Sequence, residues 1–296
     1  MSDSTPQHLQ RRIPVLRTEP AKRGYLVAVT CWGKPDMIPL ILDSWKSNYH
    51  PEDASLVFVF DSMEDEELAV YWRHRVLRMP EYHFLPPVVN EGPEWYENGS
   101  HAALVALFRD HSLQPSHAIG AEGGALRFRS ATALNFHTMI VWQDDQQVRG
   151  FRLLDDLDSL RAQYGDSLGL VGGRDGFLPG YGDMASNAHT PSGLSKMILN
   201  PGEHARRPIL NRGPVIYPRH VVEKVGAIDL LNFPMWHAEA DYSARCHKAG
   251  FVNVVLGVEC EHAIHGRALA SRTYQGQEAT DAAAFRRIHG DLYPSV

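Results

Sequence analysis

The chain has few cysteines and no long apolar run. Its 3 cysteines, Cys31, Cys246 and Cys260, lie far apart and form neither a CxxC pair nor a zinc-ligand spacing. We therefore expect a reduced, cytoplasmic protein. No apolar run approaches the length that crosses a bilayer, so we expect no membrane span. Residues 1–20 are polar and do not resemble a secretion signal.

The common phosphate-binding and hydrolase motifs are also missing. The sequence has no GxxxxGK[ST] loop, no GxGxxG after its first predicted strand, no GxSxG and no HExxH. A bound diphosphate would therefore have to be held by a metal ion and by side chains. The formal net charge of −6 disfavours a general polyanion binder, although a local basic patch stays possible.

Apolar strand-like runs alternate along the chain with segments of helical spacing. This alternation predicts an α/β fold, in which a mostly parallel sheet carries helices on both faces of a single domain. The expected strands are at 25–30, 55–60, 168–171, 213–217 and 251–258, with a further apolar run within 136–147. The expected helices are at 37–47, 64–75, 102–111, 126–135, 153–164, 218–225, 238–249 and 279–290.

The expected organisation has three parts. Residues 1–22 form a flexible arm, residues 23–270 form the domain, and residues 271–296 form a C-terminal helix and tail. Within the domain we expect a nucleotide-binding half at 23–150 and an acceptor-side half at 151–270. Residues 81–98 and 172–212 read as loop regions because they are rich in turn-forming residues.

Two adjacent carboxylates end the apolar run at 136–147. The run reads Phe-His-Thr-Met-Ile-Val-Trp-Gln and is followed by Asp144 and Asp145. At the carboxyl end of a parallel strand these acids would lie where α/β sheets bind ligands. Adjacent carboxylates repel and are costly to desolvate, so they favour a bound cation. One interpretation is a metal site that serves a phosphorylated ligand. The other is a solvated strand-to-loop junction.

Other acids follow predicted strands or begin predicted helices. Asp61 ends the second strand and either contacts a nucleoside or caps the next helix. Glu239 and Asp241 lie two residues apart at the start of a helix, so they face different directions. One of them is expected to face a cleft, where a carboxylate can act as a general base, while the other binds structure. The alternative is an acid that stabilises the first helical turn through the helix dipole, which explains at least one of the two.

Histidines and arginines supply further candidates. His262 and His265 follow the predicted strand at 251–258, and imidazole is a common ligand of transition metals. Arg267 lies close behind them and can pair with a phosphate. Arg127 and Arg129 precede the apolar run, either as exposed cations or as contacts to a diphosphate. At this stage each of these residues has both a structural and a functional interpretation.

The order of four segments resembles one known family. Residues 213–229 read Gly-Pro-Val-Ile-Tyr-Pro-Arg-His-Val-Val-Glu-Lys-Val-Gly-Ala-Ile-Asp, and residues 233–251 are rich in aromatics and acids and end in Arg-x-x-x-x-Gly-Phe. Residues 124–145 lead from a glycine through Arg129 to the aspartate pair. Together with the first strand and helix at 25–44, these segments are similar to the family-2 glycosyltransferases of the GT-A fold.

The chain departs from the family pattern at several positions, among them those of the expected metal site and base. Adjacent Asp144 and Asp145 stand where the family has Asp-x-Asp, so the main metal ligand stays open. Ala238 replaces the first acid of the family's Glu-Asp pair. Glu239 then takes the place of the catalytic aspartate, with a longer side chain.

The resemblance implies an enzyme, a glycosyltransferase of the hexosyltransferase type. It would move a sugar from a nucleoside diphosphate sugar to a hydroxyl acceptor, with inversion and with Glu239 as the general base. The implied cofactor is Mn²⁺ or Mg²⁺, and its implied ligands are Asp144, Asp145 and His262. The implied donor-binding residues are Thr30, Asp61, Arg129, Asp144 and Arg267. The implied acceptor-binding residues are Phe233, Trp236 and Asp241.

The acceptor and two other functions stay open at this stage. The acceptor is a glycan, a lipid-linked molecule or a small molecule, and the acidic net charge disfavours modified DNA. One alternative function is a non-catalytic sugar-nucleotide or glycan binder. The other is a sugar-nucleotide-forming nucleotidyltransferase, which would need a glycine-rich basic loop after its first strand. Only Gly33 and Lys34 are present there.

Overall fold

The computed structural model describes fifteen stretches of the chain, namely residues 23–32, 37–50, 52–61, 83–84, 88–90, 101–102, 104–105, 108–109, 126–128, 136–143, 146–173, 199–210, 213–234, 237–262 and 275–292. The strands are β1 (Tyr25–Trp32), β2 (Ala54–Asp61), β3 (His83–Phe84), β4 (Val88–Asn90), β5 (Leu126–Phe128), β6 (Thr138–Gln143), β7 (Gln146–Val148), β8 (Leu168–Gly172), β9 (His204–Arg206), β10 (Val215–Pro218), β11 (Val252–Leu256) and β12 (Cys260–His262). The helices are α1 (Met37–Asn48), α4 (Leu153–Tyr164), α5 (Arg219–Val225), α6 (Ala238–Lys248) and α8 (Gln275–His289), with 3-10 turns η2 (Gly165–Ser167) and η3 (Gly290–Leu292). The described residues from 101 to 109 are helical too.

Ten strands form one mixed, mostly parallel sheet. Its order is β5-β4-β2-β1-β6-β10-β8-β11-β9, and β3 also pairs with β2. The central strands β2, β1 and β6 are parallel, as are β8 and β11, whereas β10 runs antiparallel between β6 and β8. A second, two-stranded sheet joins β7 and β12. The predicted parallel core with helices on both faces is confirmed.

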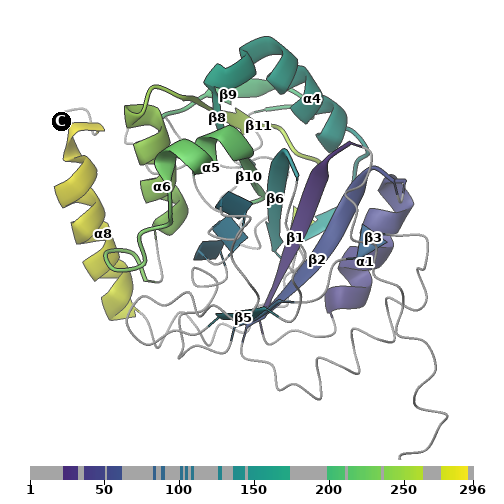
Figure 1. Cartoon of the computed structure of the whole chain (residues 1–296), viewed down its shortest axis with the longest axis horizontal. Coiled ribbons are helices and arrows are strands. Elements are labelled where there is room, and N and C mark those ends of the chain that lie inside the picture. The colour runs from purple at the N-terminus through teal and green to yellow at the C-terminus, as the bar shows by residue number, and fades with distance from the viewer. Residues whose placement is uncertain are drawn as a thin grey trace, which may run out of the picture.

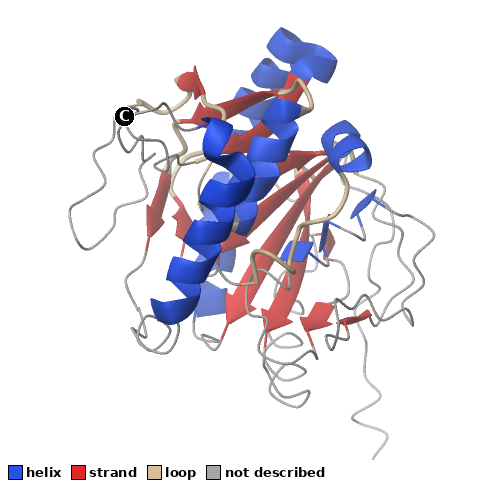
Figure 2. Cartoon of the chain, turned by 90° about the vertical axis from the view of Figure 1, so that its left-hand side faces the viewer, coloured by secondary structure: helices blue, strands red, loops and turns tan. Residues whose placement is uncertain are grey.

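The strands bury both of their faces, which follows from their nearly continuous apolar sequences. In β1, Leu26 and Ala28 face one core cluster, while Val27 and Val29 face the other. The first cluster is covered by α5, α6 and α8 together with the helical residues at 101–109, and the second by α1 and α4. Figure 1 shows α6 and α8 on one side of the strands and α1 on the other. Figure 2 shows helices in front of the strands, seen from the α8 side.

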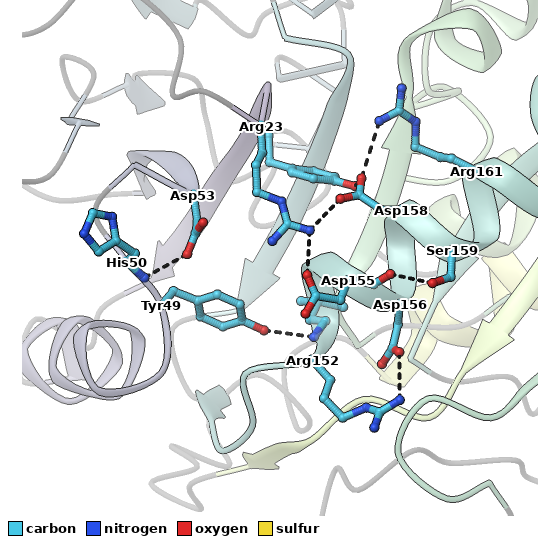
Figure 3. A network of polar contacts seen from close by, with 12 residues as sticks. Arg23, Tyr49, His50, Asp53, Arg152, Asp155, Asp156, Asp158, Ser159 and Arg161 are labelled. Carbon is cyan, nitrogen blue, oxygen red and sulfur yellow. Dashed lines mark hydrogen bonds and ion pairs between the residues drawn. The ribbon is translucent and has the colours of Figure 1, made fainter.

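A polar network fixes α4 to the start of β1 (Figure 3). Arg23 donates to Asp155 at 2.8 Å and to Asp158 at 2.5 Å, and the Tyr25 hydroxyl donates to Asp158 at 2.6 Å. At the beginning of α4 the Leu153 amide donates to the Tyr49 hydroxyl, which satisfies one of the free N–H groups of that helix end. The arginine and the hydroxyl lower the pKa of the Asp158 carboxyl against the opposing effect of burial. These contacts therefore fix the position of α4 relative to the start of β1.

Some expectations about local structure were wrong. Residues 126–128 were expected to begin a helix, but they form β5 and pair antiparallel with β4. The expected loop at 81–98 contains the short strands β3 and β4, both of which pair with β2. The segment after β11 forms a further strand, β12, which the sequence did not indicate. The arm at 1–22 and the helix expected at 64–75 lie outside the described residues.

Candidate active site at the carboxyl edge of the sheet

The connections on the two sides of β1 lie on opposite faces of the sheet, which makes a topological switch point. β1 lies between β2 and β6 and is parallel to both. The connection from β1 to β2 passes through α1, which packs on one face, whereas the helical residues at 101–109 before β6 pack on the other face. In open α/β sheets, ligands bind outside the carboxyl ends of the strands at such a switch point. The carboxyl edge of β2, β1 and β6 is therefore the candidate site.

Residues from three strands meet at this edge. The register pairs Thr30 of β1 with Gln143 of β6, and pairs Trp32 of β1 with Asp61 of β2. Asp61 is the last residue of β2, and Gln143 is the last of β6. The Thr30 hydroxyl is buried and donates to the Trp142 carbonyl at 3.4 Å. Thr30 thus binds β1 to β6 just inside the edge.

Two hydrogen bonds span the chain between β6 and β7. The indole Nε1 of Trp142 donates to the backbone carbonyl of Gln146 at 2.6 Å. The side-chain Nε2 of Gln146 donates to the side-chain oxygen of Gln143 at 3.0 Å. Helix α1 fixes the following strand, because Ser44 accepts from the Val148 amide at 3.1 Å. Both ends of the two-residue link that contains Asp144 and Asp145 are therefore held in place.

The small sheet brings a distant segment to the same place. β12 pairs antiparallel with β7, and His262 lies opposite Gln146, the residue that follows Asp145. The ladder continues through Glu261 opposite Gln147. This pairing joins parts of the chain more than 100 residues apart. It places the strand that contains His262 beside β7, the strand that follows the two aspartates in the sequence. Local periodicity gives no signal for this pairing.

Helix α6 separates the two acids of its first turn. Asp241 is 1% exposed and has a side-chain partner at each oxygen: His289 Nε2 lies 2.8 Å from Oδ1, and Arg245 Nε lies 2.8 Å from Oδ2. Glu239 is also buried, but it faces His101, whose Nδ1 lies 3.2 Å from Oε1. Asp241 therefore ties α6 to α8, whereas Glu239 points toward the helical residues at 101–109.

Glu239 lies in a buried polar cluster. Burial raises the pKa of the Tyr217 phenol, and the nearby Glu239 carboxylate raises it further. The Tyr217 hydroxyl has no hydrogen-bond partner among the described residues. Its ring packs edge-on against Tyr242, with 5.5 Å between centroids. Buried polar groups of this kind are rare, and they gather at functional sites.

The residue before α6 has an unusual backbone. His237 precedes the helix with φ 61° and ψ 9°, and it is the one non-glycine residue with positive φ in the described part of the chain. Its carbonyl accepts from the Asp241 amide at 2.7 Å, which starts the helix. Left-handed backbone at a non-glycine residue costs energy and clusters at functional sites. This backbone conformation lies two residues before Glu239, at the start of the helix that carries it.

The other predicted site residues fall into two groups. Phe233 is fully buried and packs against Phe285 at 6.3 Å between ring centroids, so its ring belongs to the core that joins α8 to the domain. The remaining residues lie outside the described part of the chain, namely Arg129, Asp144, Asp145, Trp236 and Arg267. Among the described residues, no three metal-binding side chains come together.

Sequence reasoning missed His101 and Tyr217. His101 is a lone histidine one residue before an expected helix, and Tyr217 lies within an apolar strand that reads as core. Neither has a sequence signal that points to Glu239, because the three meet only through tertiary packing.

Over the described residues, none of the helices is both long and apolar enough to cross a bilayer.

Comparisons with known proteins identify the architecture. Neither a protein-family model nor a curated protein matches the sequence. Among solved structures, the mannosyltransferase PcManGT from Pyrobaculum calidifontis, in complex with GDP-Man and Mn²⁺, superposes with a TM-score of 0.56 at 15% identity. That likeness covers 95% of this chain and 69% of PcManGT.

A second solved structure gives the same result. GalNAc-T7, solved with UDP, GalNAc and Mn²⁺, superposes with a TM-score of 0.52 at 11% identity over 81% of this chain. The match spans 43% of the GalNAc-T7 chain. Both proteins are GT-A-type glycosyltransferases. The sheet order, the helices on both faces and these two likenesses together show that the chain has the GT-A fold.

Proposed function

We propose that the protein is a metal-dependent glycosyltransferase that moves a sugar from a nucleoside diphosphate sugar to a hydroxyl acceptor. The observation that carries this proposal is the β7–β12 ladder, which brings His262 opposite the residue after Asp145. It supports a metal site at the edge where a GT-A sheet offers room for a donor. The two superposed structures, which hold Mn²⁺ with GDP-Man or with UDP and GalNAc, support the same substrate class.

The residues near this edge suit a divalent cation. Gln146, which directly follows Asp145 in the sequence, pairs with His262 in the antiparallel ladder, where paired Cα atoms are about 4.5–5.5 Å apart. The Gln146 side-chain oxygen is buried and has no hydrogen-bond partner among the described residues. Carboxylates with one imidazole suit Mn²⁺, and Mg²⁺ is the alternative.

We assign the metal to Asp144, Asp145 and His262. When bound, the ion would neutralise the negative charge that develops on the departing diphosphate. Asp61 and Thr30 contribute to the donor pocket from β2 and β1, which precede β6 in the order of the sheet. Arg129 and Arg267 are the proposed contacts to the phosphates, since a guanidinium binds phosphate with two parallel hydrogen bonds.

Glu239 is the proposed general base. It accepts the proton of the acceptor hydroxyl while that oxygen forms a bond to the anomeric carbon. The bond from this carbon to the diphosphate oxygen breaks on the opposite side, so the configuration inverts. Burial of the carboxylate keeps bulk water from competing for the site. A base near the reacting hydroxyl contributes about 10²- to 10⁴-fold to the rate.

Fewer residues are proposed to contact the acceptor than the sequence implied. Trp236 remains the proposed aromatic contact to the acceptor. We leave out Phe233 because its ring is fully buried against Phe285. We also leave out Asp241 because His289 and Arg245 already engage both of its oxygens. The proposed acceptor is a glycan, a lipid-linked molecule or a small molecule that presents a hydroxyl.

The test compares Glu239→Gln with the wild-type enzyme. The variant keeps the size and shape of the side chain but accepts no proton, so we expect turnover to fall about 10²- to 10⁴-fold. Binding of the nucleoside diphosphate, measured by thermal shift with Mn²⁺, should stay unchanged. Glu223→Gln is the matched control, because Glu223 is exposed on α5 and should retain full activity. Near-normal turnover by Glu239→Gln would exclude Glu239 as the base.

A further inference from the structure

We infer that His101 is a positioning residue for Glu239, which it holds by donating a hydrogen bond from Nδ1 to Oε1. The inference rests on the proposed role of Glu239 as the general base. His101 Nδ1 lies 3.2 Å from Glu239 Oε1, and the two side chains are 3% and 2% exposed. No other part of the proposed mechanism uses His101.

The two acids of α6 each have a histidine partner, and the comparison separates their roles. Asp241 binds His289 through an aligned 2.8 Å contact and is also paired with Arg245. The contact between Glu239 and His101 is longer, and neither ring nitrogen of His101 makes an aligned hydrogen bond among the described residues. Catalytic contacts are often loose before substrate binds and tighten in the reacting complex.

A buried carboxylate needs a donor beside it. Leaving either the carboxylate or the imidazole without a hydrogen bond in the interior costs about 1–3 kcal/mol, and more for a charged group. An imidazole with a proton on Nδ1 meets this need, because it donates one hydrogen bond to the carboxylate. It leaves Oε2 to receive the proton from the acceptor hydroxyl. His101 keeps its own proton throughout.

The helix that carries His101 is anchored at its other end. Ala102, Leu104, Val105 and Phe108 are buried in the core cluster shared with α6. Arg219 donates to the Phe108 carbonyl at 2.6 Å, and its guanidinium lies 4.2 Å from the centroid of the Phe108 ring. Arg219 also donates to the Phe136 carbonyl at 2.6 Å, which links this helix to the start of β6. The imidazole is therefore delivered by a packed element of the fold.

The neighbouring groups are consistent with an imidazole that donates to Glu239. Tyr217 approaches Glu239 from β10, and its raised pKa keeps the phenol uncharged. Asp241, Arg245 and His289 form a separate cluster of side chains that contact one another. His101 is the donor that faces Glu239 from the helical residues at 101–109.

The test uses three variants that move or remove the donor, together with one control. His101→Asn puts an amide N–H near the position of Nδ1, whereas His101→Gln puts it near the position of Nε2. His101→Leu keeps the volume but donates nothing. We expect the Leu and Gln variants to lower kcat about tenfold to a hundredfold with the KM for the donor within about twofold, and the Asn variant to stay within about threefold of wild type. The fourth variant, His289→Leu, is the matched control and should lower Tm while leaving kcat unchanged.

The outcomes separate this inference from the proposed function. If Glu239→Gln is inactive but His101→Leu and His101→Gln turn over at the wild-type rate, His101 has no positioning role and the inference fails alone. If His101→Asn is as slow as His101→Gln, the position of the donor is irrelevant and the inference also fails. If His101→Leu does not fold, the Asn and Gln pair still decides. Retained turnover in Glu239→Gln would instead remove the proposed base itself.

Discussion

Replacement of Trp142 by phenylalanine tests what holds the two ends of the link at residues 144–145, Gln143 and Gln146. Trp142 is fully buried, and its Nε1 donates to the Gln146 carbonyl across the link that contains Asp144 and Asp145. Phenylalanine keeps an aromatic ring in β6 but loses this donor and part of the buried volume. We expect the variant to fold and to bind metal and nucleotide more weakly, because the ends of the link are no longer joined by this bond.

The chain offers a matched control in Trp45. This side chain is equally buried and packs against Trp142 at 6.2 Å between centroids, but its Nε1 has no hydrogen-bond partner among the described residues. Both substitutions lose similar volume, which costs on the order of 1–2 kcal/mol. Trp142→Phe also loses a hydrogen bond worth about 0.5–1.5 kcal/mol and leaves a carbonyl unsatisfied. Trp45→Phe instead removes an unsatisfied donor. The expected difference between the two variants is about 2 kcal/mol.

Two measurements decide this prediction. Urea denaturation gives the free energy of unfolding of each variant, and titration with a nucleoside diphosphate in the presence of Mn²⁺ gives its affinity. We expect Trp142→Phe to lose about tenfold or more in affinity, as outer-shell supports of metal sites do. Trp45→Phe should bind as the wild type does. Equal stability and equal affinity in both variants would refute the idea that the Trp142 bond organises the link.

Two further predictions concern the fold. Burial and the nearby Arg161 lower the pKa of His137 in the folded protein, so as the pH falls below about 6.5 the unfolded chain takes up this proton first and the wild type loses stability. The difference in free energy of unfolding between the wild type and His137→Gln should therefore narrow from about pH 7.5 to about pH 5. A constant difference would contradict this prediction. In Gly257→Ala the new Cβ would lie 2.1 Å from the Asn200 carbonyl oxygen, so we expect a loss of roughly 1–3 kcal/mol by urea denaturation. Gly290→Ala, with no atom within 4 Å, is its control and should be nearly neutral.

The elements that the sequence predicted well are those with long, consistent periodicity. The helix expected at 153–164 has those bounds in the structure, and the strands expected at 25–30 and 55–60 extend by only one or two residues. The short strands were not predicted, because two or three residues carry no period. Residues 126–128 have helical spacing but become a strand, since pairing with β4 supplies partners that outweigh local preference.

Helix geometry accounts for part of the candidate site, and long-range packing accounts for the rest. Glu239 and Asp241 are spaced i, i+2 on α6 and have different partners, as that spacing implies. The Arg245 partner of Asp241 lies at i+4 and follows the same geometry. His289 and His101 lie far from α6 in sequence, so only the folded chain brings them to the two acids.

The measurement that tests the central claim most directly is the thermal unfolding of the wild type, Asp144→Asn and Asp145→Asn with nucleoside diphosphates, with and without Mn²⁺. A ligand at a hundred times its Kd stabilises the folded state by about 2.7 kcal/mol. The account predicts a clear rise in Tm for the wild type only when both nucleotide and Mn²⁺ are present. It predicts that the rise is lost in at least one of the two variants. Stabilisation that is absent with every nucleotide, or that survives in both variants, would contradict it.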